Sequence, residues 1–237
     1  MPTLQLGDIA VDVVLKDIKN IHLSVHPPVG KVRIAAPLRM DLDTIRVFAI
    51  AKLAWIKSQQ KKLREQERET PREYLDRESH TVWGKRYLLK LVEKDAAPSV
   101  ELKHNAMILQ LRPATSQEKR QGLLDAWYRE QLKAALPPLM AKWEKILGVK
   151  AGKVFVQKMK TKWGACNPGP NNIRLNSDLA KKPLQCLEYI VAHELTHLLE
   201  RRHNDRFTAS MDAHMPQWRQ YREMLNSLPL AHSEWRY

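Results

Sequence analysis

Residues 191–207, VAHELTHLLERRHNDRF, place three histidines and a glutamate in otherwise leucine-rich surroundings. Residues 184–200 carry apolar side chains at helical spacing, which at about 100° per residue fall within one broad arc that predicts a core face. The residues of that arc are Leu184, Leu187, Ile190, Val191, Leu195 and Leu198. His193 and His197 lie beside one edge of the arc, roughly 40° apart, and Glu194 projects into its middle.

The spacing His-Glu-x-x-His predicts a metal site rather than a packing helix. Two imidazoles four residues apart on one helix face can hold a single metal ion. A lone carboxylate is costly to bury in an apolar face, but it suits a polar cavity that holds a cation and water. Zinc lowers the pKa of a water toward about 7, and a neighbouring carboxylate can accept its proton as the water attacks a carbonyl. We therefore expect Zn2+ as the cofactor, His193 and His197 as ligands, and Glu194 as the catalytic general base.

The third ligand is expected to be His203, six residues after His197. On a continued helix His203 would point roughly 240° away from His197, so the chain must leave the helix between residues 199 and 202. The metzincin pattern HExxHxxGxxH has the same histidine offsets and makes this turn with its glycine. Here Glu200 stands at the glycine position, which argues against a true metzincin. His214 is a rival third ligand, because its distance along the chain also allows a return to the site.

Five motifs together resemble the YgjP-like zinc metallopeptidase family, which is related to the SprT-like and WLM metallopeptidases. The motifs are HELTHLLERRHNDRF (193–207), WGAC (163–166), NIRLNSDLA (172–180), MPQW (215–218) and IHLSVHPPVGKVRIAAP (21–37). The resemblance implies that His193, His197 and His203 are zinc ligands and that Glu194 is the catalytic acid/base. It also implies a minimal zincin-like core, preceded by a β-rich N-terminal part, that acts on a protein or peptide. The family commonly has serine where Ala165 stands, a departure that does not affect the metal.

The charge of the chain leaves other functions open. Its 40 Lys and Arg against 26 Asp and Glu give a net charge of +14, which favours a polyanionic partner such as nucleic acid or a nucleotide. One alternative is therefore a zinc-dependent hydrolase of nucleotide phosphoanhydrides, although the sequence has no glycine-rich phosphate loop. Another is a nucleic-acid-binding module with a structural zinc. Structural sites are normally closed by four protein ligands, so a glutamate beside the histidines argues against that module.

The order of predicted elements indicates an α+β fold in two parts. Residues 1–113 read as a β-rich N-terminal region with a hairpin at 21–34 and one helix at 40–69. Residues 114–237 read as the zinc metallopeptidase domain, in which a helix from about residue 116 is interrupted or ends near Pro137-Pro138 and resumes to Leu147, and a short antiparallel sheet lies beside the histidine helix. An edge strand of that sheet could receive an extended polypeptide. No internal repeat is apparent.

Three smaller expectations complete the analysis. Trp163-Gly164 is interpreted as a packing feature, and Arg174 and Asn176 are candidates for substrate contact. No apolar run approaches the roughly 20 residues that cross a bilayer, so no membrane association is expected. The start of the chain lacks the pattern of a signal peptide, and two cysteines are too few for a disulfide framework. We therefore expect a cytoplasmic protein.

Overall fold

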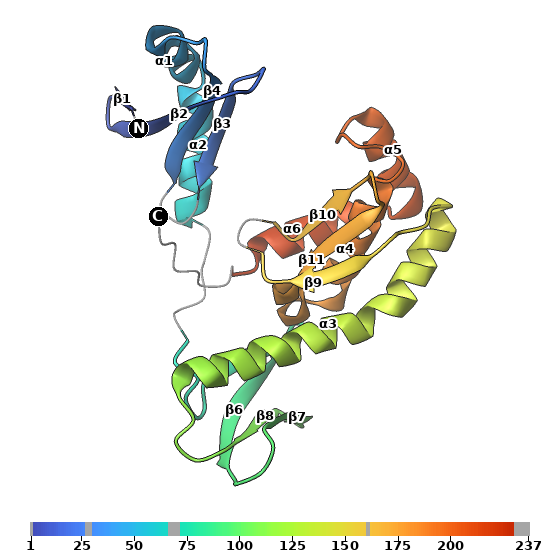
Figure 1. Ribbon diagram of the computed structural model, residues 1–237. Coiled ribbons are helices and arrows are strands. Elements are labelled where there is room, and N and C mark those ends of the chain that lie inside the picture. The colour runs from blue at the N-terminus through green and yellow to red at the C-terminus, as the bar shows by residue number, and fades with distance from the viewer. Residues whose placement is uncertain (1, 27–29, 66–71, 160–161, 230–237) are drawn as a thin grey trace. The chain divides into compact units, whose positions relative to one another are not determined.

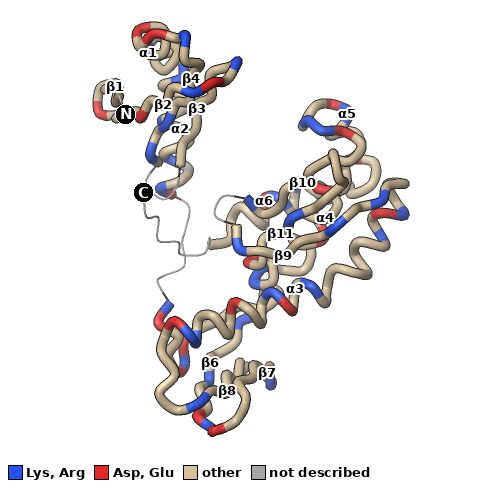
Figure 2. The backbone as a smooth tube through the Cα atoms, viewed as in Figure 1, with Lys and Arg blue, Asp and Glu red and all other residues tan. Residues whose placement is uncertain are grey.

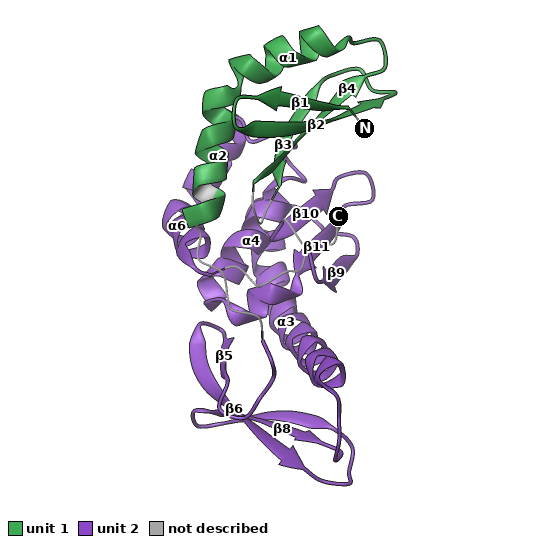
Figure 3. Ribbon diagram, turned by 90° about the vertical axis from the view of Figure 1, so that its left-hand side faces the viewer, with its two compact units in different colours: residues 1–68, 233–237 green, residues 69–232 purple. Residues whose placement is uncertain are grey.

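The computed structural model describes residues 2–26, 30–65, 72–159 and 162–229 (Figure 1). They form a mixed α+β structure in two compact units, residues 1–68 with 233–237 and residues 69–232 (Figure 3). The expected boundary at 113 and 114 falls inside the second unit and, as a division of function, stays a prediction. Within the described residues, no helix has the length and apolar character needed to cross a membrane.

The first unit is a four-stranded sheet covered by two helices. Its elements are β1 (Thr3–Leu6), β2 (Ile9–Lys16), β3 (His22–His26), β4 (Lys31–Pro37), α1 (Leu42–Ala51) and α2 (Leu53–Glu65). The strand order is β1-β2-β4-β3, with a parallel pair β2–β4 between two antiparallel pairs. Alternate side chains such as Val13 and Ile34 are fully buried with Ile45 of α1. The predicted hairpin is confirmed as β3–β4, with residues 27–29 of its turn outside the described residues.

The predicted single helix at 40–69 is instead two helices over its described part, and residues 66–69 lie outside the described residues. The first begins where predicted, because Asp41 accepts a hydrogen bond from the amide of Thr44 at 2.7 Å and so caps α1. It ends at Ala51, and α2 begins at Leu53. Lys52 between them has φ −101° and ψ 5°, outside the regular helix. Ile45, Ala49 and Ile56 are buried in the same core, so both helices contribute to one apolar face.

The second unit begins with a sheet of the same design. Its strands are β5 (Ser79–Val82), β6 (Lys85–Glu93), β7 (Ser99–Lys103) and β8 (Ala106–Leu111). Their order, β5-β6-β8-β7, and their pairing directions repeat those of the first sheet, and a helix follows each sheet. The expectation of no internal repeat was therefore wrong for the architecture. Strand pairing depends on alternating apolar positions and turns, so it can recur without recognisable sequence identity.

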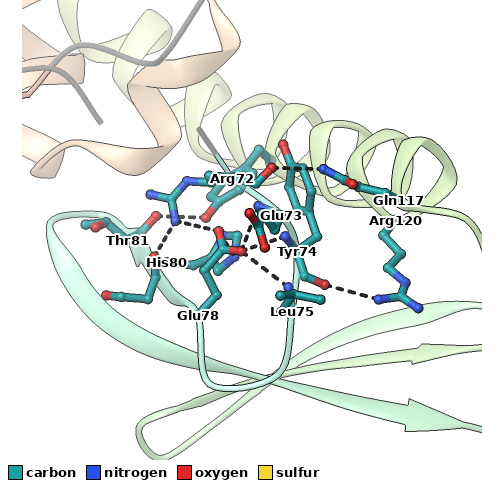
Figure 4. A network of polar contacts seen from close by, with 11 residues as sticks. Arg72, Glu73, Tyr74, Leu75, Glu78, His80, Thr81, Gln117 and Arg120 are labelled. Atoms are coloured by element: carbon teal, nitrogen blue, oxygen red, sulfur yellow. Dashed lines mark hydrogen bonds and ion pairs between the residues drawn. The ribbon is translucent and has the colours of Figure 1, made fainter. Parts of the chain in front are cut away.

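A loop of polar contacts fixes the start of the second unit (Figure 4). The carboxylate of Glu78 accepts hydrogen bonds from three consecutive backbone amides and lies 3.2 Å from the guanidinium of Arg72. These amides belong to Glu73, Tyr74 and Leu75. The side chain of Gln117, in the helix α3 (Gln117–Leu147), donates to the carbonyl of Arg72 at 3.3 Å. The loop is thereby tied to the long helix that follows the sheet.

The helix α3 runs without interruption through the two prolines, near which an interruption or an end was expected, and it reaches Leu147 as predicted. Pro137 and Pro138 lie inside the helix, which continues to a left-handed cap at Gly148 with φ 66°. Leu136 and Met140, on either side of the prolines, are both buried in the main core. Tertiary packing on both sides of the two prolines therefore outweighs their local cost to the helix.

The remaining elements surround the histidines. They are β9 (Val154–Gln157), β10 (Gly164–Asn167), β11 (Asn172–Asn176), the 3-10 helix η1 (Ser177–Lys181), and the helices α4 (Leu184–Thr196), α5 (Asp205–His214) and α6 (Trp218–Ser227). The sheet order is β10-β11-β9. The expected antiparallel pair is confirmed as β10–β11, and β9 adds to β11 as a parallel strand. This leaves β10 at an edge, where it packs beside α4.

Candidate metal centre

The helix α4 presents Glu194 to the interior, as its apolar spacing predicted. Leu187, Val191 and Leu195 are fully buried on the same helix. Glu194 is only 5% exposed although it carries a carboxyl group. Burial raises the pKa of Glu194 to about 7, against the opposing effects of the charge of Lys162 and a hydrogen bond from the amide of Cys166.

The three predicted histidine ligands lie together. One ligand atom from each of His193, His197 and His203 falls within 4.8 Å of the others. The Nε2 atoms of His193 and His203 are 3.0 Å apart, and the three ring centroids are separated by 4.7 to 4.9 Å. The rival His214 is elsewhere: it is exposed at the end of α5, with Nδ1 at 2.8 Å from the carbonyl of Ser210.

A tight turn without glycine brings His203 back to the helix. The regular helix ends at Thr196, a few residues before the expected exit, and the amide of Glu200 bonds the Thr196 carbonyl at 2.9 Å. Asn204 then caps α5 through its side chain. Among the described residues, those with positive φ include none from 196 to 204, so this turn needs no left-handed residue. Glu200 at the metzincin glycine position is thus compatible with the return of His203.

The imidazoles of His193 and His197 are neutral at pH 7, the form that binds a metal ion. Burial, followed by the charges of the neighbouring histidines and Arg222, lowers the pKa of His193 to about 3. Burial likewise lowers the pKa of His197. The Nδ1 atom of His197 lies 3.0 Å from the Glu200 carbonyl, and we assign it the proton, which leaves Nε2 free to bind a metal. Three converging imidazoles, two of them neutral at pH 7, are a donor set that fits zinc.

Gly164 on β10 makes room for the carboxylate. A Cβ atom at this position would lie 2.5 Å from Oε1 of Glu194 and 2.8 Å from its Cγ. Gly164, interpreted from the sequence as part of a packing feature with Trp163, thus lies against the candidate base. The sequence held no direct signal for this contact, because the two residues are thirty positions apart.

The two strand residues expected near substrate, Arg174 and Asn176, differ from each other in burial. Asn176 is 5% exposed, and its amide nitrogen donates to the carbonyls of Met159 and Lys162 at 2.9 and 3.0 Å. Asn176 therefore holds Met159 and Lys162, two described residues before β10, through its side chain. Arg174 is half-buried, with its guanidinium 5.6 Å from the ring centroid of Phe155.

Aromatic residues that the sequence did not single out surround the histidines. Phe207 is 2% exposed, and its ring centroid lies 4.8 or 4.9 Å from each of the three imidazoles. Tyr189, one helical turn before His193, packs edge-to-face on that ring at 5.7 Å. Trp218 of the MPQW motif stacks on Tyr189 at 6.4 Å. The contact between Tyr189 and His193 could have been predicted, because side chains four residues apart on a helix are neighbours.

Comparisons with known proteins identify a family. The family described as "YgjP-like, metallopeptidase domain" matches residues 19–228. No curated protein matches the chain. The crystal structure of the metallopeptidase zymogen of Pyrococcus abyssi abylysin is similar at 20% identity and a TM-score of 0.36, over 40% of this chain and 97% of that chain.

Proposed function

The chain belongs to the YgjP-like metallopeptidase family, and from this premise we propose that it is a zinc-dependent peptidase. The observation that carries the proposal is the convergence of three imidazoles beside a buried carboxylate. His193, His197 and His203 would hold the ion. When bound, zinc supplies a Lewis acid that polarises a carbonyl and lowers the pKa of water.

Glu194 is the proposed general base. Its buried carboxylate, next in sequence to the proposed ligand His193, would accept a proton from water and return that proton to the nitrogen of the leaving amine. The amide of Cys166 donates to the carboxylate, and Gly164 leaves space for it. Both residues belong to β10, so one strand holds the base in place.

The edge strand β10 offers a place for the substrate backbone. Its inner side pairs with β11, and the three-stranded sheet ends at β10. An extended peptide could add to the other side of β10 as a further strand, with side chains alternating on either face. That geometry would bring a peptide bond alongside Glu194, which contacts the first residue of the strand.

The test compares zinc-loaded wild type with Glu194→Gln on an unfolded protein, with and without DNA, and on nucleoside triphosphates. We expect peptide products from wild type only. His214→Ala is the matched control, because His214 lies outside the histidine group and should leave turnover intact. Equal proteolysis by Glu194→Gln would refute the base, and nucleotide products in place of peptides would refute the peptidase.

The assay with DNA tests whether the net charge of +14 reflects nucleic-acid binding. Figure 2 shows Lys and Arg along both units rather than gathered on one element. No described feature favours nucleotide hydrolysis or DNA binding over peptide hydrolysis. Nucleic-acid binding and a cytoplasmic location therefore remain predictions from the sequence.

A further inference from the structure

We propose that an aromatic support, made of Tyr189, Phe207 and Trp218, sets the orientation of the His193 ring in place of a hydrogen bond. This inference rests on the proposed role of His193 as a metal ligand. A histidine that binds a metal through one ring nitrogen usually donates its other N–H to a carboxylate or carbonyl, which fixes the ring. His193 departs from that arrangement.

The two helix histidines differ at Nδ1. The Nδ1 of His197 has the Glu200 carbonyl at 3.0 Å. The Nδ1 of His193 is buried, and the described residues offer it no hydrogen-bond partner. Its Nε2 faces Nε2 of His203 at 3.0 Å, so the unpartnered nitrogen is the one turned away from the histidine group. Some other interaction must therefore restrain the ring of His193.

Aromatic rings supply that restraint from two sides. Tyr189 meets the His193 ring at a centroid distance of 5.7 Å and an interplanar angle of 70°. Phe207 meets it at 4.9 Å and 68°. Both are edge-to-face contacts, the arrangement that aromatic rings prefer, and rotation of the imidazole would disrupt them. Because Tyr189 and Phe207 are 5% and 2% exposed, neither has room to follow such a rotation.

The support is itself anchored on α6. Trp218 lies nearly parallel to Tyr189, with an interplanar angle of 15° and a centroid distance of 6.4 Å. The Trp218 Nε1 donates to Asp212 at 2.7 Å, and Asp212 is also paired with Arg219 at 3.1 Å. The path from Asp212 through Trp218 and Tyr189 therefore links α5 and α6 to the ligand on α4.

The experiment measures metal binding without relying on turnover. The zinc dissociation constant is determined by chelator competition, and the visible spectrum of the Co2+-loaded protein reports the ligand geometry. Tyr189→Leu and Phe207→Leu should each weaken zinc binding by about tenfold or more, the range seen when the partner of a ligand is lost. Tyr189→Phe keeps the ring and should stay near wild type. Tyr128→Leu is the matched control, since Tyr128 is 3% exposed in the same core, where its ring meets Trp127 and its hydroxyl donates to the carbonyl of Thr81.

Two results would overturn the inference. One is wild-type zinc affinity and an unchanged Co2+ spectrum in folded Tyr189→Leu and Phe207→Leu. The other comes from NMR of zinc-loaded wild type, which needs no variant to fold: a His193 Nδ1 proton as far downfield as that of His197 would reveal a hydrogen bond. Failure of wild type to bind zinc would instead refute the proposed function, and the support with it.

Discussion

Replacing Gly164 by alanine is expected to lower turnover by about 100-fold while leaving the metal site formed. The new methyl group would sit 2.5 Å from Oε1 and 2.9 Å from Cδ of Glu194, where ordinary contacts begin at about 3.4 Å. The carboxylate or β10 must therefore move by about 1 Å. The φ angle of Gly164 is not positive, so alanine adds no backbone strain, and the effect should come from this contact alone.

The expected loss follows from the size of that displacement. A misplacement of about 1 Å in a reacting group can cost about 100-fold in rate, which corresponds to about 2.7 kcal/mol of transition-state stabilisation. Overpacking also costs about 1–3 kcal/mol of folding stability. Zinc affinity should be near wild type, because the three atoms nearest to the added methyl group all belong to Glu194.

The assay is kcat/KM on an unfolded protein substrate, with zinc affinity and thermal stability measured in parallel. Gly169→Ala, in the turn after the same strand, is the control, since its added Cβ would meet nothing closer than 3.7 Å. In a Glu194→Gln background, Gly164→Ala should cost little further activity, because both changes act on one group. Full activity of Gly164→Ala, or equal further loss in both backgrounds, would refute the reasoning.

Three further predictions concern charge and metal. Since burial raises the pKa of Glu194 to about 7 from 4.5, the metal-free fold must bury an ionised carboxylate above pH 7. Glu194→Gln should therefore stabilise metal-free protein by about 3 kcal/mol more at pH 8 than at pH 4 in urea unfolding, and an equal effect at both pH values would contradict this. His203→Ala should weaken zinc binding far more than His214→Ala in a chelator competition, and the reverse ranking would move the third ligand. Lys162 lowers the pKa of Glu194 and Arg222 that of His193, so both bring positive charge to the site. Peptides with acidic residues beside the scissile bond should then have a lower KM than neutral peptides. Lys162→Glu and Arg222→Glu should abolish this preference, and an unchanged preference in these variants would show that the two cations do not contact the substrate.

The local pattern of the sequence was sufficient for α4 and its inward glutamate. Apolar side chains at helical spacing define a buried arc, and a carboxylate inside that arc can be identified without knowing its neighbours. The position of His203 beside the other two histidines could be predicted only if the chain left the helix and turned back after His197. Gly164 could not be linked to Glu194 at all, because nothing in either local segment records a contact between residues thirty positions apart.

The fold shows the same division between local and distant information. Strand alternation predicted the hairpin β3–β4, whose partners are neighbours in the chain. Strand alternation did not predict that β2 would pair with β4 in parallel. Either strand of the hairpin could have paired with β2, and which one does so depends on the assembled sheet. At Pro137 and Pro138 the local rule for proline failed, because the core contacts of α3 on both sides outweigh it.

The turn after α4 bears on how such proteins are found. A search pattern that requires glycine three residues after the second histidine would pass over this chain, which has Glu200 there. Since no residue from 196 to 204 has a positive φ, position 200 does not require glycine. Related sequences can therefore drift at this position without losing the third histidine, and spacing is a safer criterion for recognising them than the residue at the bend.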